Sequence, residues 1–356
     1  MNDQSFVSIP AVGELEYPFK TVPETGRTIE VAPGVHWLRM PLPMSLNHIN
    51  LWAIEDGDGW TLVDTGMQTS QIASAWESML VGPLAGRPVL RVICTHMHPD
   101  HVGMAGWLTR RFECPFWMTR LEYVTCRMLV ADTGRQAPPD ALRFYQASGW
   151  KAADLEHYKA RFGGFGKMVY ALPDSYHRVT HGDQFLIGRH HWHAVVGRGH
   201  SPEHLCLYCP QLRLLISGDQ VLPKITPNVS VFPTEPDADP LREWLESLAM
   251  IRATVPDEVL VLPAHNEPFN GLHARTTQLI EGHERSLERL LEALREPRTG
   301  SDVFSVLFRR SVSTDVLQMA TGESVAHLNC LIQRGQATRT LDDAGVAWYR
   351  AHAATV

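Results

Sequence analysis

The amino-acid sequence predicts an α/β fold, specifically a four-layer αββα sandwich with a helical insertion and a small C-terminal domain. Two stretches of the chain, at about 35–112 and 184–296, each begin with short apolar strands and end in helices. Each stretch can therefore supply one sheet and the helices that cover it, although the sequence leaves the pairing of the strands open. An aromatic-rich helical segment at about 120–172 separates the two stretches and forms the predicted insertion.

The strands of the first stretch are short and combine apolar with aromatic residues, as β-strands do. They are expected at 35–40, 49–54 and 60–63, with a buried apolar strand at 88–95. Turn residues at 56–59 indicate a hairpin between the second and third of these strands. A helix is expected at about 68–80, where apolar residues recur at helical spacing.

The second stretch returns to strands and then ends in a long polar helix at about 273–296. Its strands are expected at about 184–197, 204–209, 212–217 and 258–262. The last sixty residues form a separate unit, in which short helices at about 301–309, 313–319 and 322–334 precede a strand pair that ends near Trp348. Helices followed by a small hairpin resemble a winged-helix module. We therefore expect a catalytic domain over 1–272 and a C-terminal helical, winged-helix-like domain over 273–356.

The composition is that of an ordinary soluble globular protein, with 44% hydrophobic and 20% charged residues among 356. A net charge of −7 gives no general attraction to nucleic acid or to an anionic membrane. Neither a signal-peptide core nor about 18 consecutive apolar residues occurs, so no export and no membrane span is expected. Six scattered cysteines fit reduced thiols in a cytoplasmic protein. The high count of 18 histidines directs attention to metal binding.

The densest group of metal-binding residue types is Thr95-His96-Met97-His98-Pro99-Asp100-His101, which directly follows the apolar strand at 88–95. Because side chains alternate along an extended chain, His96 and His98 can project to the same side. Asp100 and His101 then fall on the following turn and can reach a second position nearby. Imidazole and carboxylate ligands together suit Zn, Fe, Mn or Co. Four such residues at this spacing predict a metal site rather than a chance polar loop.

This segment resembles the His-X-His-X-Asp-His signature of the metallo-β-lactamase superfamily. Four further motifs of that family follow the same order along the chain, and the resemblance covers roughly residues 30–270. They are Val63-Asp64-Thr65-Gly66, Gly199-His200-Ser201-Pro202-Glu203-His204, Ser217-Gly218-Asp219 and Pro263-Ala264-His265.

The resemblance implies a centre with two divalent metal ions, expected to be Zn, with Fe or Mn as alternatives. It places the first metal on His96, His98 and His200 and the second on Asp100, His101 and His265, with Asp219 bridging the two. A water or hydroxide between the metals is then the expected nucleophile. The resemblance also implies that Asp100 is catalytic, because it would orient the nucleophile and carry a proton to the leaving group. Asp64 and His204 look like residues that hold the ligands in orientation.

The ligand set narrows the choice within the superfamily. Secreted antibiotic-degrading members typically lack the histidine at position 101 and carry a cysteine at position 219, so a true β-lactamase is not expected. Flavodiiron reductases have a carboxylate in place of His98 and a flavin domain that is absent here. The pattern is most similar to the glyoxalase II and lactonase branches. Residues 222–230 and the C-terminal unit together resemble the lactamase-beta-2-like subgroup, in which Lys224 or Asn228 could contact substrate.

Two departures from the family pattern stand out. Glu203 replaces the usual glycine before the second histidine of its motif. The interval between His101 and His200 is also longer than in compact relatives, and the excess is the insertion at 120–172. The insertion could cap the metal cleft and shape the pocket, or it could form a dimer interface or an extra core layer.

We expect a hydrolase of acyl bonds, acting on a thioester such as acyl-glutathione or acyl-CoA, or on a lactone. The alternatives are a nuclease or other phosphodiesterase and a mononuclear iron persulfide dioxygenase. A binding protein that only kept the fold would not be expected to retain a complete ligand set. Residues 274–356 hold ten arginines, no lysine and ten acidic residues, which argues against nucleic acid as a partner. The expected partners are a small-molecule substrate and a second copy of the chain in a homodimer. Binding to a membrane is not expected.

Two other groups of residues have spacings similar to those of functional sites. His190, His191 and His193 lie on a predicted strand with alternating faces, which favours structural or surface roles. Cys206 and Cys209 resemble a redox pair, but within a strand they point to opposite faces. Neither redox chemistry nor zinc binding is therefore expected of them.

Overall fold

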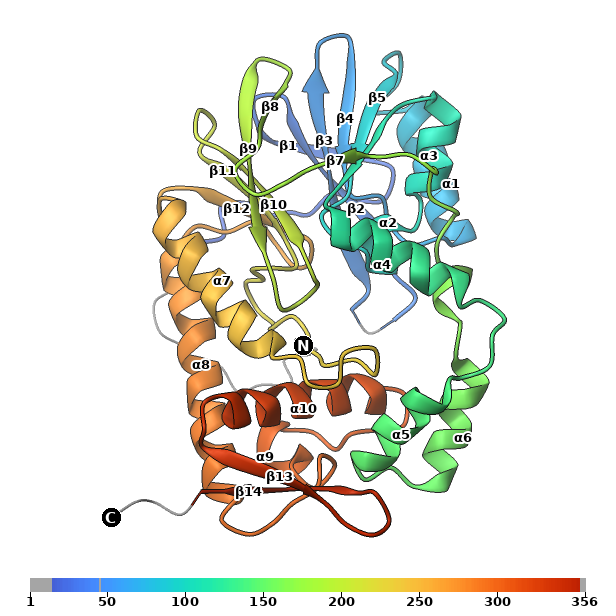
Figure 1. Ribbon diagram of the computed structural model, residues 1–356. Coiled ribbons are helices and arrows are strands. Elements are labelled where there is room, and N and C mark those ends of the chain that lie inside the picture. The colour runs from blue at the N-terminus through green and yellow to red at the C-terminus, as the bar shows by residue number, and fades with distance from the viewer. Residues whose placement is uncertain (1–14, 45, 353–356) are drawn as a thin grey trace.

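In the computed structural model, which describes residues 15–44 and 46–352, the first sheet has seven strands in sequence order (Figure 1). Strands β1 to β4 pair antiparallel, and β4 to β7 run parallel. The strands are β1 (Thr28–Ala32), β2 (Val35–Pro41), β3 (His48–Asp56), β4 (Gly59–Val63), β5 (Val89–Ile93), β6 (Phe116–Met118) and β7 (His177–Arg178).

The second sheet has five strands in the order β12-β11-β10-β9-β8. Strands β8 to β11 are antiparallel neighbours, whereas β12 pairs parallel with β11. Its strands are β8 (Gln184–Ile187), β9 (His190–Gly197), β10 (His204–Cys209), β11 (Leu214–Gly218) and β12 (Leu260–Pro263). The strands predicted from the sequence are present with shifts of a few residues at their ends, except that the stretch expected as one strand at 184–197 forms two antiparallel strands, β8 and β9.

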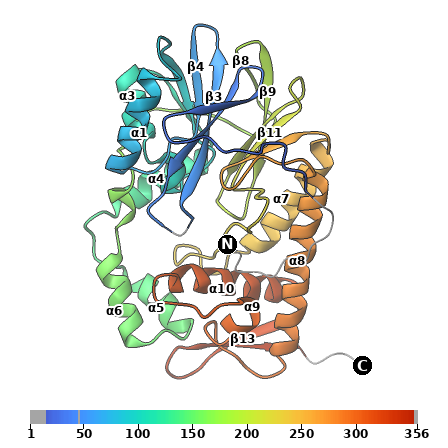
Figure 2. The ribbon, with the colours of Figure 1, turned by 180° about the vertical axis from the view of Figure 1, so that it is seen from behind.

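The two sheets pack against each other and carry helices on their outer faces, which confirms the four-layer sandwich (Figure 2). The outer helices are α1 (Ser70–Val81) and α3 (Ala105–Phe112) on the first sheet and α7 (Pro240–Thr254) and α8 (Leu272–Ala293) on the second. Between the sheets, Trp37, Trp52 and Ile93 pack in one core cluster with Trp192 and Leu207. All residues of β4 are buried. Helices cover the outer face of its sheet and the other sheet covers the inner face, so neither face meets solvent.

The insertion consists of α4 (Arg120–Ala131), α5 (Pro139–Ala147), α6 (Ala152–Arg161) and a 3₁₀ turn, η1 (Phe165–Lys167). Beyond α4, it leaves the sandwich and packs against the C-terminal unit (Figure 1). The indole Nε1 of Trp150 donates to Thr321 Oγ1 at 2.8 Å, and the Ser301 amide donates to the Ser148 carbonyl at 2.9 Å. The insertion and the C-terminal unit, which are far apart in the sequence, therefore pack against each other.

The C-terminal unit follows α8 and contains α9 (Phe304–Leu307), α10 (Leu317–Gln333) and the antiparallel pair β13 (Ala337–Leu341) and β14 (Ala347–Ala351). The expected helices at 313–319 and 322–334 are wrong as separate elements, because α10 runs without a break through Gly322. Residues 320–331 of this helix are all buried, so tertiary packing outweighs the low helix propensity of glycine. The winged-helix resemblance of this unit stays a prediction.

Cys206 and Cys209 on the second sheet point to opposite faces, as their alternation along the strand predicts. Cys206 belongs to the core cluster on the outer face of the sheet, and Cys209 belongs to the cluster between the sheets. All six cysteines are free thiols. No helix within residues 15–44 and 46–352 has the length and apolar character needed to cross a membrane.

Candidate metal centre

Seven potential metal ligands meet at one edge of the two sheets, because each of them follows the end of a strand. They are His96, His98, Asp100, His101, His200, Asp219 and His265. The exit of β5 and the short helix α2 (Pro99–Val102) supply the first four, and the segments after β9, β11 and β12 supply the others. Hydrogen bonds join the sheets at this edge, from the Leu205 amide to the Thr95 carbonyl at 2.8 Å and from the Asn50 amide to the Ala264 carbonyl at 2.7 Å.

One cluster contains His96, His98, His200 and Asp219, whose ligand atoms all lie within 4.8 Å of one another. His96 Nε2 is 2.8 Å from His98 Nδ1 and 3.3 Å from His200 Nε2. Asp219 Oδ2 is 3.5 Å from His200 Nε2. Three imidazole rings from two sheets thus direct ring nitrogens at a common point.

A second cluster contains Asp100, His101 and His265. Asp100 Oδ2 lies 3.8 Å from His101 Nε2 and 3.4 Å from His265 Nε2. The carboxylate of Asp219 also faces this cluster, with Oδ2 at 3.6 Å from His101 Nε2 and Oδ1 at 3.4 Å from His265 Nε2. Asp219 is therefore shared between the two clusters.

The geometry of both clusters fits a bound cation. Ligands placed about 2.0–2.1 Å from a tetrahedral zinc ion lie roughly 3.3 Å from one another, which is close to most of the separations found here. His101 Nε2 and Asp219 Oδ1 are buried and have no hydrogen-bond partner among the described residues. Buried polar atoms are rarely left without a partner. Imidazole and carboxylate groups can bind Zn, Fe or Mn, so the donor set fits divalent metals without identifying one of them.

Burial keeps two histidines of the first cluster, His96 and His98, neutral. Burial lowers the pKa of His98 to about 3, and the neighbouring His200 contributes to the shift. The pKa of His96 lies well below its usual value for the same reason, with the rings of His101 and His98 adding to the effect of burial. Neutral imidazole is the form that binds metal ions.

In the second cluster, nearby carboxylates raise the pKa of the histidines by more than burial lowers it. Burial opposes protonation of His265, yet the carboxylates of Asp219 and Asp100 raise its pKa to about 10. Burial likewise opposes protonation of His101, but Asp64, Asp100 and Asp219 raise its pKa well above the usual value. Burial acts to raise the pKa of Asp100, whereas His101 and His265 hold it at about 2. These carboxylates create a position that favours positive charge, which either two protons or a metal ion can supply.

The ring nitrogens that face away from the clusters are held by other groups. His101 Nδ1 is 2.8 Å from Asp64 Oδ2, His200 Nδ1 is 2.8 Å from the Asn228 carbonyl, and His265 Nδ1 is 2.9 Å from the His48 carbonyl. A hydrogen bond at one nitrogen fixes the ring and leaves the other nitrogen for a metal. The family motifs indicate the role of Asp64, whereas no motif indicates that the Asn228 and His48 carbonyls orient histidines.

Asp64 and His204 occupy the positions that the resemblance implied. The Asp64 carboxylate also accepts from the Thr95 amide at 2.8 Å, which anchors the start of the histidine segment. Asp64 has φ = 61°, a left-handed conformation that is unusual for a residue other than glycine. His204 Nε2 accepts from the Asp219 amide at 3.0 Å. Both residues therefore fix the main chain next to the clusters.

Sequence reasoning missed Glu122, a fully buried residue of α4. Its Oε2 accepts from the Met97 amide at 2.9 Å, and its Oε1 accepts from Ser201 Oγ at 2.6 Å and from the Glu203 amide at 2.8 Å. One carboxylate thus joins the segment that contains His96 and His98 to the segment that contains His200. A single acidic residue in an amphipathic helix gives no signal of such a role, because most glutamates in helices face solvent.

The departure at Glu203 also has a structural reason. The Glu203 carboxylate accepts from the Leu121 amide at 2.9 Å, and the Glu203 carbonyl accepts from Thr119 Oγ1 at 2.8 Å. The first amides of a helix need acceptors, and an acidic group is favoured there. The Glu203 carboxylate therefore links the beginning of α4 to the segment that contains His200, a contact that glycine could not make.

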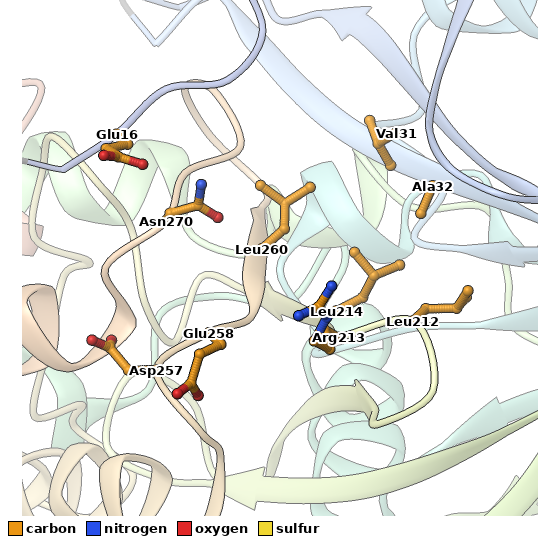
Figure 3. A pocket seen from close by; sticks show the side chains of 10 residues that line it. All are labelled: Glu16, Val31, Ala32, Leu212, Arg213, Leu214, Asp257, Glu258, Leu260 and Asn270. Carbon is orange, nitrogen blue, oxygen red and sulfur yellow. The ribbon is translucent and has the colours of Figure 1, made fainter.

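None of the seven potential ligands lines the surface hollow in Figure 3. It has a volume of about 480 Å³ and combines acidic with apolar side chains. Its lining residues are Glu16, Val31, Ala32, Leu212, Arg213, Leu214, Asp257, Glu258, Leu260 and Asn270. The chemistry of the donor atoms, rather than the size of a hollow, therefore locates the candidate site.

Comparisons with known proteins concern the fold and the family of the chain. A solved structure of a beta-lactamase domain protein from Burkholderia ambifaria is 40% identical, covers 95% of this chain and 99% of its own, and superposes with a TM-score of 0.84. The metallo-beta-lactamase family protein TTHA1429 from Thermus thermophilus is 23% identical, covers 91% and 100% of the two chains with a TM-score of 0.76, and supports the fold alone. A probable metallo-hydrolase, YflN of Bacillus subtilis (strain 168), is 25% identical over 56% of this chain and 68% of its own.

Two family models match different parts of the chain. Residues 287–352 match the metallo-beta-lactamase-like C-terminal domain, which corresponds to the end of α8 and the C-terminal unit. Residues 45–265, more than half of the chain, match the metallo-beta-lactamase superfamily domain. The chain therefore belongs to the metallo-beta-lactamase superfamily of metallo-hydrolases.

Proposed function

We propose that the protein is a dinuclear-metal hydrolase that cleaves an acyl bond, either a thioester of glutathione or CoA or a lactone. The observation that carries the proposal is the position of Asp219, whose two carboxylate oxygens face histidines of both clusters at 3.4–3.6 Å. A carboxylate shared in this way is suited to bridging two cations, whereas a mononuclear site needs only one of the clusters.

The first metal is assigned to His96, His98 and His200, the second to Asp100, His101 and His265, and Asp219 to both. Zinc is the metal we expect, with iron or manganese as alternatives. When bound, paired metals lower the pKa of a coordinated water toward neutrality and polarise the bond that is cleaved.

Among the two central carboxylates, Asp100 is the one we assign to proton transfer. Its side chain is 17% exposed and that of Asp219 is 10% exposed, so solvent and substrate reach Asp100 more readily. The pKa of Asp100, held at about 2 by His101 and His265 against the effect of burial, keeps its carboxylate ionised near pH 7. An ionised carboxylate can accept a proton from the attacking water and return it to the leaving thiolate or alkoxide.

A substrate panel with metal-defined protein tests this function. It contains an acyl-glutathione, an acyl-CoA, a homoserine lactone and bis-p-nitrophenyl phosphate, each with a chelator control. Turnover of a thioester or lactone that chelation abolishes supports the proposal, and the Asp100→Ala variant should lose that turnover. Turnover of the phosphodiester alone would replace the proposal with a phosphodiesterase, and oxygen consumption with glutathione persulfide would replace it with a dioxygenase. A small-molecule substrate, a homodimer and a cytoplasmic location stay predictions.

A further inference from the structure

The C-terminal unit contributes one buried carboxyl group to the boundary with the sandwich. Glu323 lies on α10 and is 1% exposed. Its Oε2 accepts a hydrogen bond from Asn228 Nδ2 at 2.9 Å, and its Oε1 is buried with no partner among the described residues. Burying a carboxyl group with so few partners costs free energy. A buried polar group that lowers the stability of the fold in this way needs an explanation, and we look for it in function.

The partner of Glu323 is in direct contact with a residue of the first cluster. Asn228 belongs to the segment between β11 and α7, and its carbonyl oxygen is 2.8 Å from His200 Nδ1. The opposite nitrogen, His200 Nε2, faces the cluster at 3.3 Å from His96 Nε2. Because a carbonyl accepts only from a protonated nitrogen, Asn228 fixes both the tautomer and the direction of the His200 ring.

The segment that carries Asn228 has no regular structure of its own, and α10 holds it from the other side. Ser230 Oγ donates to Asn228 Oδ1 at 2.5 Å and is 3.4 Å from the Met319 carbonyl. The Val231 amide donates to the Gly322 carbonyl at 3.0 Å. Figure 1 shows this segment running between the open edge of the sheets and α10.

The close approach of α10 to the segment depends on a glycine. A Cβ atom added at Gly322 would lie 2.6 Å from Ser230 Oγ, 2.7 Å from Ser230 Cβ and 2.9 Å from the Val231 carbonyl oxygen. Real Cβ atoms do not come so close to such atoms, so a side chain here would push the segment away from the helix. Gly322 and Glu323 together set the position of Asn228.

We propose that α10 is a positioning element of the metal centre: Glu323 and Gly322 hold the Asn228 carbonyl against His200 and so set the affinity of the first cluster for its metal. The C-terminal unit then serves the metal site directly, beyond packing against the sandwich. The inference rests on the proposed function in one respect, the assignment of His200 as a metal ligand.

The test measures binding of Co²⁺ to the metal-free full chain, by competition with a chelator and by the visible absorption of the bound ion. Glu323→Leu removes the acceptor of Asn228 Nδ2, and the affinity of the first Co²⁺ should fall about 10- to 100-fold, as for other groups that orient metal-binding histidines. Its visible spectrum should shift as well. Glu323→Gln should restore the wild-type affinity and spectrum, because its amide oxygen can still accept from Asn228 Nδ2.

Ser324→Ala is the matched control, since it removes a buried hydroxyl of the same helix that has no hydrogen-bond partner among the described residues. It should bind Co²⁺ as the wild type does. If Glu323→Leu does not fold, Asn228→Ala carries the same test, because it removes the link to Glu323 and keeps the carbonyl. Wild-type affinity and spectrum in a folded Glu323→Leu or Asn228→Ala variant would overturn the inference. Failure of the wild type itself to bind Co²⁺ would instead overturn the proposed function.

Discussion

Replacing Glu122 by alanine should lower both the free energy of unfolding and the affinity of the centre for its metal. The carboxylate accepts from two main-chain amides, those of Met97 and Glu203, and from the hydroxyl of Ser201. A buried donor that loses its acceptor costs roughly 1–3 kcal/mol. Burial of the carboxylate, which raises the pKa of Glu122, offsets part of that loss when the group is removed. We therefore expect the free energy of unfolding to fall by about 2–4 kcal/mol.

The effect on the metal centre follows from where the three donors lie. Met97 separates His96 from His98, and Ser201 follows His200. Without the shared carboxylate, the two segments lose their common anchor. Groups that support metal ligands typically contribute 10- to 100-fold to metal affinity, and we expect the affinity of the first metal to fall by about that factor.

Urea unfolding of the metal-free variant and chelator competition of the loaded variant measure the two effects separately. Glu122→Gln should be intermediate, because an NH2 group replaces one of the two oxygens and cannot accept from an amide. Glu156→Ala is the surface control: its ion pair with Lys159 is exposed, so its free energy of unfolding should change by less than about 0.5 kcal/mol. The reasoning is refuted if Glu122→Ala unfolds within about 0.5 kcal/mol of the wild type and keeps its metal affinity.

Three further predictions concern the shared carboxylate, pH and metal removal. Asp219→Ala should retain less than one equivalent of metal after gel filtration while His193→Ala retains two, as measured by elemental analysis; two equivalents in Asp219→Ala would contradict a shared ligand. Burial raises the pKa of Glu323 to about 8 from a usual 4.5, so the folded chain binds a proton that the unfolded chain releases. The free energy of unfolding of the wild type relative to Glu323→Gln, measured with urea, should therefore be greatest below about pH 4.5. It should fall by about 1.4 kcal/mol per pH unit up to about pH 8. A difference between the two proteins that does not change with pH would contradict the shift. Chelation of metal that was 100-fold above its Kd should lower the free energy of unfolding by about 2.7 kcal/mol per site, and an unchanged thermal midpoint would show that the metal does not bind the folded state.

The sequence predicts the layers of this fold and four of the seven proposed ligands because these depend on local patterns. His96 to His101 are neighbours along the chain, and the strand before them is mostly apolar, with Val89, Val92 and Ile93 buried. His200, Asp219 and His265 could be added only through the order of the family motifs, since no periodicity predicts that three loops meet. The structure brings these loops together because all of them leave the same edge of the two sheets.

The supporting contacts could not be predicted because they join distant segments through single residues. Glu122 and Ser201 are far apart in sequence, as are Asn228 and Glu323, and neither pair has a spacing that identifies it. The break expected before residue 322 was wrong for a related reason. Local propensity disfavours glycine in a helix, whereas the close contact between Gly322 and Ser230 requires it.

The most direct test of the account is a titration of the metal-free protein with Zn²⁺ while hydrolysis of a thioester or lactone substrate is measured. We expect no turnover without metal and a rise that reaches its maximum at two equivalents, because two clusters share Asp219. Full turnover by the metal-free protein, or a maximum at one equivalent with no further binding, would contradict a dinuclear hydrolase.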